Sequence, residues 1–188
     1  MSAFYCIDNG VHLTNTMKID LLRVDIVLKP VLANLLELYL HDFTDVTPFE
    51  GTRDVDESGR FGYKYLDHYW KDPARHPFII KADGKIAGFV FVNLSHEEGE
   101  EPNTHGISEF LIIRKYRHKG VGEQAAQRIF DMFPGKWRIG QLQGNSPAQQ
   151  FWKNVIGSYT QGNFKESVGD KGPYQTFDNS GLPDGSPR

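Results

Sequence analysis

The chain holds a single cysteine, Cys6, among its 188 residues, which excludes an intrachain disulfide and any zinc cluster built from cysteine thiolates. It has no apolar run near the roughly 18 residues that a transmembrane helix needs, and no basic, apolar leader of the secretory type. Positive charge is not in excess either, because 21 lysines and arginines are set against 24 acidic residues. We therefore expect a cytoplasmic protein whose partners are neither membranes nor nucleic acids.

Two common nucleotide-binding patterns are also missing. The sequence has no Gly-x-x-x-x-Gly-Lys-Ser/Thr loop and no Gly-x-Gly-x-x-Gly fingerprint. Its seven histidines lack a metal-ligand spacing such as His-Glu-x-x-His, so no metal site is predicted. A length of 188 residues suits one domain, which we place at residues 17–178. Residues 1–16 are expected to be an N-terminal extension, and the Gly/Pro/Ser-rich residues 179–188 a flexible tail.

One stretch combines a strand, a basic turn and a helix. Residues 107–113 are apolar and β-branched, which predicts a largely buried strand, and apolar residues recur at helical spacing over 121–133. Between them lies the sequence RHKGVG at 117–122. Its two glycines let another group approach the main chain, and the N–H groups at a helix start lack partners and lie at the positive end of the dipole. This turn is suited to bind a pyrophosphate.

The residues that follow make the pattern more specific. Residues 136–142 predict another strand, and NSPAQQFW at 145–152 opens a further helix. The order strand, R-x-x-G-x-G, helix, strand, N-x-x-A-x-x-F-aromatic resembles the GCN5-related N-acetyltransferase (GNAT) superfamily. The resemblance is sharp over 107–157 and looser over 18–178. The segments EFLIIRKYRHKGVG, FPGKW and FWKNVIGSYTQG are more similar still to a group of bacterial predicted acetyltransferases.

The expected fold is an α+β domain of the three-layer α/β type. The resemblance implies a mixed, mostly antiparallel sheet of about seven strands with about four helices. Asp83-Gly84 is a strong hairpin-turn dipeptide between two predicted strands. The remaining elements are predicted as strands at 18–24, 77–81, 86–94, 159–166 and 173–177, and as helices at 30–41 and 59–70.

The resemblance implies acetyl-CoA as the cofactor, held in a cleft between splayed strands four and five. The pantetheine arm would pair with the main chain of Phe110, Leu111 and Ile112, and the amide of Leu111 or Ile112 would polarise the thioester carbonyl. The pyrophosphate would meet, largely through main-chain groups, Arg117, His118, Lys119, Gly120, Val121 and Gly122.

The second motif helix supplies three further candidates. Asn145 is either an N-cap, a contact to the pantetheine or substrate, or both. Ala148 would be small to let the pantetheine pass. Trp152 departs from the family pattern, in which many members carry a tyrosine that protonates the leaving thiolate. Because an indole N–H cannot serve as that acid, Tyr159 and Tyr174 become the candidate acids.

Glu109 is the leading candidate base. A carboxylate in an apolar strand is costly unless it is paired or solvated, and it directly precedes the residues expected to contact the cofactor. The alternatives are a strand residue that faces solvent, or one that pairs with Arg114. His105 is a second candidate base.

Acceptor recognition is expected between the first two predicted helices. Negative charge there would attract a cationic amine, although a solvated loop is the alternative. The acidic residues are Asp42, Asp45, Glu50, Asp54, Asp56 and Glu57. Other side chains that could line an acceptor site are His68, Tyr69, Trp70, Arg75 and His76.

We therefore expect an acetyl-CoA-dependent N-acetyltransferase that moves the acetyl group directly to a primary amine of a small molecule or peptide. One alternative is a non-catalytic acyl-CoA-binding or regulatory module, and a second is an interaction domain that binds no CoA. A homodimer is left open.

Overall fold

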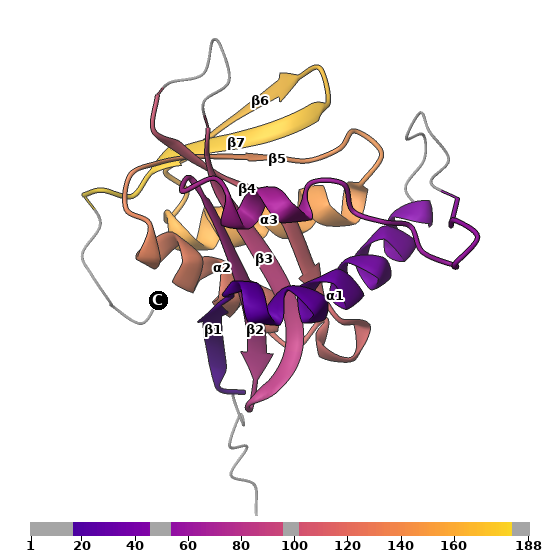
Figure 1. Ribbon diagram of the computed structural model, residues 1–188. Helices are drawn as coiled ribbons and strands as arrows, with labels where there is room; N and C mark the ends of the chain where they lie inside the picture. The colour runs from indigo at the N-terminus through magenta and orange to yellow at the C-terminus, as the bar shows by residue number, and fades with distance from the viewer. Residues whose placement is uncertain (1–16, 46–53, 96–101, 182–188) are drawn as a thin grey trace, which may run out of the picture.

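A seven-stranded sheet runs through the domain in the order β1-β2-β3-β4-β5-β7-β6 (Figure 1). The computed structural model describes residues 17–45, 54–95 and 102–181, and the account below concerns these residues. Neighbouring strands are antiparallel except for β4 and β5, which confirms the mixed, mostly antiparallel sheet. The strands are β1 Ile19–Arg23, β2 Arg75–Ala82, β3 Lys85–Ser95, β4 Thr104–Ile112, β5 Lys136–Gly140, β6 Lys165–Gly169 and β7 Gly172–Asp178.

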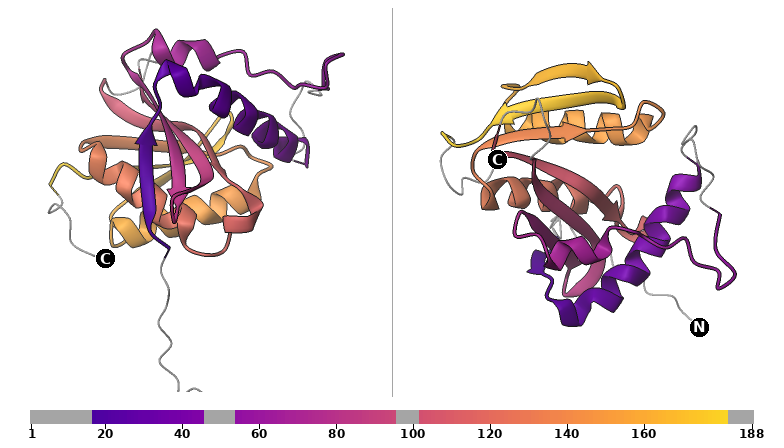
Figure 2. Two further views of the ribbon diagram at one scale, coloured as in Figure 1. Left: turned by 60° about the horizontal axis from the view of Figure 1, so that its bottom comes forward. Right: turned by 45° about the horizontal axis from the view of Figure 1, so that its top comes forward.

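Helices cover both faces of the sheet, so the domain has three layers (Figure 2). The helix α1 (Lys29–Asp42) and the short 3-10 helix η3 (Leu66–Trp70) lie on one face, and α2 (Val121–Met132) and α3 (Ser146–Tyr159) lie on the other. Three further 3-10 turns complete the elements: η1 Ile26–Leu28, η2 Phe43–Asp45 and η4 Arg114–Tyr116. Within the described residues, no helix is both long enough and apolar enough to cross a membrane.

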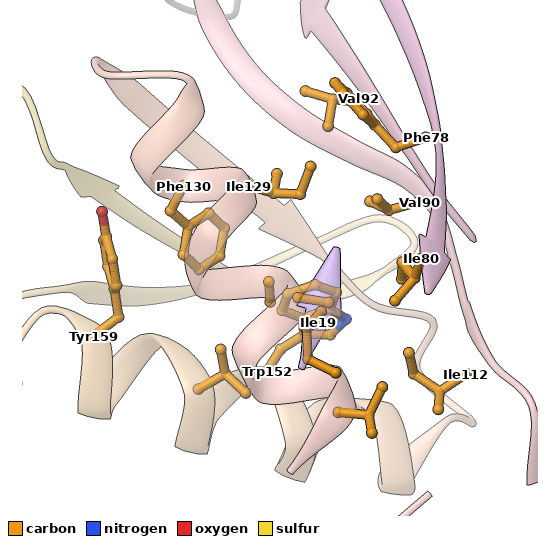
Figure 3. Close-up of a cluster of buried hydrophobic side chains, with 14 of the residues drawn as sticks. Ile19, Phe78, Ile80, Val90, Val92, Ile112, Ile129, Phe130, Trp152 and Tyr159 are labelled. Carbon is orange, nitrogen blue, oxygen red and sulfur yellow. The ribbon is translucent and has the colours of Figure 1, made fainter. Parts of the chain in front are cut away.

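The alternation of side chains along the central strands divides the core in two. Phe89 and Phe91 of β3 pack in the cluster under α1 and η3, whereas Val90 and Val92 pack under α2 and α3. Figure 3 shows the second cluster, in which Phe130 of α2 lies beside Tyr159 of α3. The hairpin at Asp83-Gly84 is confirmed: both residues have positive φ, 49° and 75°, as a tight hairpin turn requires.

The predicted helix at 59–70 is wrong. Only Leu66–Trp70 is helical, as a 3-10 helix, so the described residues contain three α-helices rather than about four. Gly59 and Gly62 adopt positive φ of 76° and 67°, which interrupts a helix. The carboxylate of Glu37 in α1 also accepts hydrogen bonds from the main-chain N–H groups of Phe61 and Gly62, at 2.7 Å and 3.2 Å, and holds this segment against the helix.

The predicted strand at 159–166 begins too early. The buried stripe Trp152, Val155, Ile156 and Tyr159 continues at helical spacing, so α3 runs on to Tyr159 and β6 starts at Lys165. Asn179, placed by the sequence in the tail, is buried and donates to the carbonyl of Phe130 at 2.7 Å.

His105 lies where β4 meets β5, between the rings of Phe133 and Trp137. Its Nδ1 is buried without a hydrogen-bond partner in the described structure. Burial lowers the pKa of His105 below its ordinary value of 6.5, although the main chain of Pro134 opposes this shift. The pKa of the neighbouring His76 is also lowered, by burial first and then by the charges of Arg23 and His105. Both shifts favour the neutral form of the imidazole in the folded chain.

The lowered pKa values of His105 and His76 lead us to expect that the fold loses stability in mild acid. The unfolded chain protonates them as the pH falls through about 6.5, while the folded chain does so only at lower pH. The stability that the neutral rings contribute to the fold is thus fully present above about pH 6.5, and it is lost as the pH falls from there through the lower pKa values of the folded chain. His105→Phe keeps the ring contacts and removes one titrating group, so the fall of Tm between pH 7 and pH 5 should become shallower. The exposed His68→Gln is the control, and equal slopes for wild type and His105→Phe would contradict this account.

Candidate active site

β4 and β5 pair at one position only. β4 pairs with β3 along its length, but its register with β5 consists of His105 opposite Trp137 within the described residues. Beyond that point the two strands diverge (Figure 1). The C-terminal half of β4 therefore has a partner strand on one side.

The register with β3 decides which main-chain groups face the diverging side. The N–H of Ile113 donates to the carbonyl of Ala87 at 2.8 Å, so this is a hydrogen-bonded pair. Such pairs alternate in an antiparallel ladder, so Leu111 also directs its polar groups toward β3, and Phe110 and Ile112 direct theirs toward β5. Two contacts agree: a Cβ at Gly88 of β3 would overlap the Leu111 carbonyl oxygen, and the Ile112 carbonyl accepts from Arg117 Nε at 2.7 Å.

Of the three main-chain candidates, the register thus favours Phe110 and Ile112 over Leu111. Arg117 already binds the Ile112 carbonyl, and a ligand chain lying where β5 has moved away could pair with the other main-chain groups on this side. This is the first feature of the site that a pantetheine amide arm would fit.

Aromatic rings fill the space between β4 and the start of α3. Phe110 lies 5.6 Å from the ring of Phe151 and 5.1 Å from that of Trp152, and the last two are 5.0 Å apart. Trp152 is 6% exposed and also contacts Phe130, so the indole is a core side chain beside the divergence (Figure 3). The sequence alone does not predict this cluster as a unit, because its members come from β4 and α3.

The turn from β4 into α2 has the expected helix start. Gly120 is the N-cap with a φ of 74°, and no side chain caps the first N–H groups of α2. A Cβ at Gly120 would meet only Gln124 Nε2, at 3.5 Å, so the main chain there is open to another group. His118 and Lys119 are exposed, and His118 also has a positive φ, 57°. Unpaired N–H groups and the helix dipole make this turn an anion site.

Gly122 has a different role from Gly120. A Cβ at Gly122 would lie 3.2 Å from Phe151 and 3.3 Å from Ile112, so this glycine lets the start of α2 pack against β4 and α3. Val121 between them is fully buried. A side chain is thus open to the surroundings at Gly120 and crowded at Gly122, and the cofactor contacts of both glycines stay predictions.

Asn145 is an N-cap, as one of its two interpretations predicts. Its Oδ1 accepts from the N–H of Ala148 at 3.1 Å at the start of α3. Ala148 is partly buried and packs on the same core as Phe151. The cofactor contacts of both residues stay predictions.

Arg117 ties the turn to the opposite face of the sheet. It donates to Ile112 through Nε and to Asp42, at the end of α1, through its terminal nitrogen. Arg114 donates to the other oxygen of Asp42 at 2.7 Å. Burial alone would raise the pKa of Asp42, but the hydrogen bonds and charges of the two arginines outweigh it and hold that pKa below its ordinary value. Asp42 therefore forms an ion pair with both arginines, and its expected role in attracting an acceptor stays a prediction.

Glu109 lies on the α1 face of the sheet, the face opposite to Phe110. Tyr63, in the segment before η3, donates its hydroxyl to Glu109 Oε1 at 2.7 Å. Arg114, the partner considered from the sequence, bonds to Asp42 instead. Ser108, the residue before Glu109, bonds to Tyr69 at 2.8 Å. Neither Tyr63 nor Ser108 was predicted as a site residue. For Tyr63 the reason is that its segment was assigned to a helix.

The structure does not bring the other candidate acids and bases to Glu109. His105 lies four residues earlier on β4, roughly 13 Å along the strand, on the α2 side. Tyr159 lies at the far end of α3, where its hydroxyl donates to Asp131 at 2.8 Å and accepts from Asn179. Tyr174 lies on β7, with the guanidinium of Arg138 stacked 3.9 Å from its ring centre.

The predicted acceptor-side residues scatter as well. Tyr69 is buried, Trp70 donates to the carbonyl of Val24, and Arg75 pairs with Asp72. His76 faces α2, and His68 is exposed. Asp54, Asp56 and Glu57 are exposed; Glu50 and the side chain of Asp45 lie outside the described residues. Where residues are described, no group of three or more His, Cys, Asp or Glu side chains could hold a metal ion.

Residues 32–157 match the family model described as the acetyltransferase (GNAT) family. The chain therefore belongs to the GNAT acetyltransferase family. A comparison with curated protein sequences found no match.

Solved structures share the fold at low sequence identity. An acetyltransferase from Thermus thermophilus has a TM-score of 0.62 and 19% identity, over 87% of this chain and 98% of that one. The aminoglycoside acetyltransferase AAC(6')-Ib in complex with coenzyme A has a TM-score of 0.58 and 17% identity, over 86% and 95%. The yncA structure from Salmonella typhimurium, with its cofactor acetyl-CoA, has a TM-score of 0.59 and 13% identity, over 87% and 94%. These likenesses confirm the GNAT-like fold.

The packing of Trp152 generates a stability prediction. Trp152→Ala removes a buried ring in contact with three others and should lower the free energy of unfolding by about 3–5 kcal/mol. Trp152→Phe retains most of the contacts and should cost much less. Denaturant unfolding of both variants measures the difference, and near-equal losses would contradict a packing role for the indole.

Proposed function

We propose that this chain is an acetyl-CoA-dependent N-acetyltransferase that transfers the acetyl group directly to a primary amine. The observation that carries the proposal is the divergence of β4 from β5 beside the uncapped start of α2. Together they offer main-chain partners for an amide-containing arm and an anion site for a pyrophosphate, in a chain of the GNAT family. That yncA and AAC(6')-Ib were solved with acetyl-CoA or CoA supports the choice of cofactor.

The residues then divide the work of the reaction. When bound, acetyl-CoA supplies an activated acetyl group as a thioester. Phe110 and Ile112 hold the arm through their main-chain groups, and the amide facing the divergence polarises the thioester carbonyl. Glu109 takes the proton from the acceptor amine as the C–N bond forms and the C–S bond breaks.

Protonation of the leaving thiolate has no assigned group near Trp152. Tyr159 is engaged with Asp131 in the core, which disfavours it, and Tyr174 remains the candidate from the sequence. Because a CoA thiolate is a tolerable leaving group, transfer does not require a tyrosine at position 152. The acceptor is a small molecule or peptide amine, and no metal takes part.

Gly120 allows a direct test of the pyrophosphate site. Asn and Asp have the same shape and both tolerate positive φ, so Gly120→Asn and Gly120→Asp differ only in charge. Gly120→Asp should weaken CoA binding by about tenfold or more relative to Gly120→Asn, since a negative charge would face the pyrophosphate. Isothermal titration at low ionic strength measures both affinities, with folding checked by thermal melt. Equal affinities would move the pyrophosphate away from this turn.

Glu109→Gln tests the base. We expect kcat to fall by about 10²–10⁴ with the affinity for acetyl-CoA unchanged, because the amide cannot accept the amine proton. The matched control is Glu166→Gln, which replaces an exposed strand carboxylate that bonds to Lys153. Release of CoA with a panel of primary amines measures turnover, and wild-type kcat in Glu109→Gln would assign proton removal to solvent.

The same assays separate the alternatives. Acetyl-CoA binding without turnover of any amine would support the non-catalytic binding module. Absence of binding by either acetyl-CoA or CoA would leave only the interaction domain.

A further inference from the structure

A β-bulge turns two consecutive residues of β4 to the same face. Phe91 of β3 lies opposite Glu109 and Val92 lies opposite Ile107, so Ser108 is the extra residue at this point of the ladder. The hydrogen bond from Tyr63 shows that the Glu109 side chain lies on the α1 face, and the contact with Tyr69 shows the same for Ser108. Bulges commonly redirect a side chain beside an active site.

Tyrosine hydroxyls from one short segment hold both of these residues. Tyr63 donates to Glu109 Oε1 at 2.7 Å, and the hydroxyl of Tyr69 lies 2.8 Å from Ser108 Oγ. Each tyrosine is also fixed against Phe91, with ring centres 6.3 Å away for Tyr63 and 4.1 Å away for Tyr69. The direction of each hydroxyl is therefore set by a packed ring.

The helix α1 holds the segment that carries Tyr63. Glu37 accepts the N–H groups of Phe61 and Gly62 with its two oxygens, at 2.7 Å and 3.2 Å. Gly62 adopts a φ of 67°, which turns the chain back toward the sheet just before Tyr63. A carboxylate on α1 thus fixes the main chain one residue away from the tyrosine that bonds to Glu109.

Tyr63 serves as a donor only. Burial raises its pKa far above the ordinary value of a tyrosine, and the neighbouring Glu109 charge and Tyr69 raise it further. The phenol therefore keeps its proton throughout the range in which an enzyme works. It cannot replace Glu109 as a base, but it can orient the carboxylate.

We infer that Tyr63 is a positioning residue that orients the carboxylate of Glu109 for the acceptor amine, and that Glu37 holds Tyr63 in place by anchoring Phe61 and Gly62. This inference rests on the proposed function, in which Glu109 takes the amine proton. It adds a second layer to the site, built from α1 and the segment before η3.

The test compares Tyr63→Phe with Tyr65→Phe, which removes a hydroxyl two residues away on a 53% exposed side chain. Tyr63→Phe should lower kcat by about tenfold and leave the KM for acetyl-CoA unchanged, because only the orientation of the base is lost. The acidic limb of the pH profile of kcat should move to higher pH, since the lost hydrogen bond favoured the ionised carboxylate. Tyr65→Phe should change neither.

A double-mutant cycle supplies the second readout. In the Glu109→Gln background, Tyr63→Phe should cause no further loss of kcat, because its effect passes through Glu109. Glu37→Gln keeps only one carboxyl-type acceptor and should shift kcat and the acidic limb in the same direction as Tyr63→Phe. Additive losses in the cycle, or an unmoved acidic limb in Tyr63→Phe, would overturn the inference.

Carboxyl ¹³C resonances separate this inference from the proposed function. In a chain labelled at the glutamate Cδ, the Glu109 signal is the one that disappears in Glu109→Gln. Its titration midpoint should move to higher pH in Tyr63→Phe, whether or not any amine is turned over. An unmoved midpoint overturns the positioning role alone, whereas a shifted midpoint without acetyl transfer overturns the proposed function alone.

Discussion

Among the residues that the structure describes, β4 pairs with β3 along its length but with β5 only where His105 meets Trp137. Main-chain groups must be hydrogen-bonded or solvated, so a strand that loses one neighbour has N–H and C=O groups along that edge that need other partners. The rest of the site is arranged around this edge. Aromatic side chains of β4 and α3 close the space on the helix side, and the turn into α2 directs its free N–H groups to the same end of the strand.

The two faces of the sheet contribute different parts of the site, and β4 joins them. Phe110 and Ile112 turn their side chains to α2 and α3, whereas Glu109 turns its carboxylate to α1 and the segment before η3. Under the proposed function, a single strand thus carries the main-chain groups for the cofactor and the carboxylate for the acceptor in adjacent positions. Asp42 connects the two sides again, because it lies on α1 and bonds to both arginines of the turn.

The sequence predicted the elements with strong local patterns. The turn at Asp83-Gly84, the helix after Gly120 and the helix capped by Asn145 all follow from short-range rules that do not depend on the rest of the fold. The helix prediction for residues 59–70 was wrong because their apolar side chains are spaced as in a helix. Gly59 and Gly62 were sequence evidence against it, since each interrupts a helix and both adopt positive φ.

The candidate site was predicted to the extent that it lies in contiguous motifs. Phe110, Ile112 and Gly120 are close in sequence, so their grouping could be read from one stretch. The bond from Tyr63 to Glu109 spans 46 residues, and no local pattern encodes it. Tyr159 was assigned to a strand although its spacing from Val155 and Ile156 continues the buried stripe of α3, so its place at the end of that helix was missed.

The order of the sheet leaves β1 and β6 at its two edges, and each is only five residues long. An edge strand offers unpaired main-chain groups to any other extended chain, so long and apolar edges invite aggregation. Here Lys18 and Asp20 lie at the start of the first edge and Lys165 and Glu166 open the other, with ion pairs at 3.3 Å on β1 and at 2.9 Å between β6 and Lys153 of α3. Short length and charge at both edges disfavour edge-to-edge pairing between the sheets of different molecules, and so reduce open-ended aggregation.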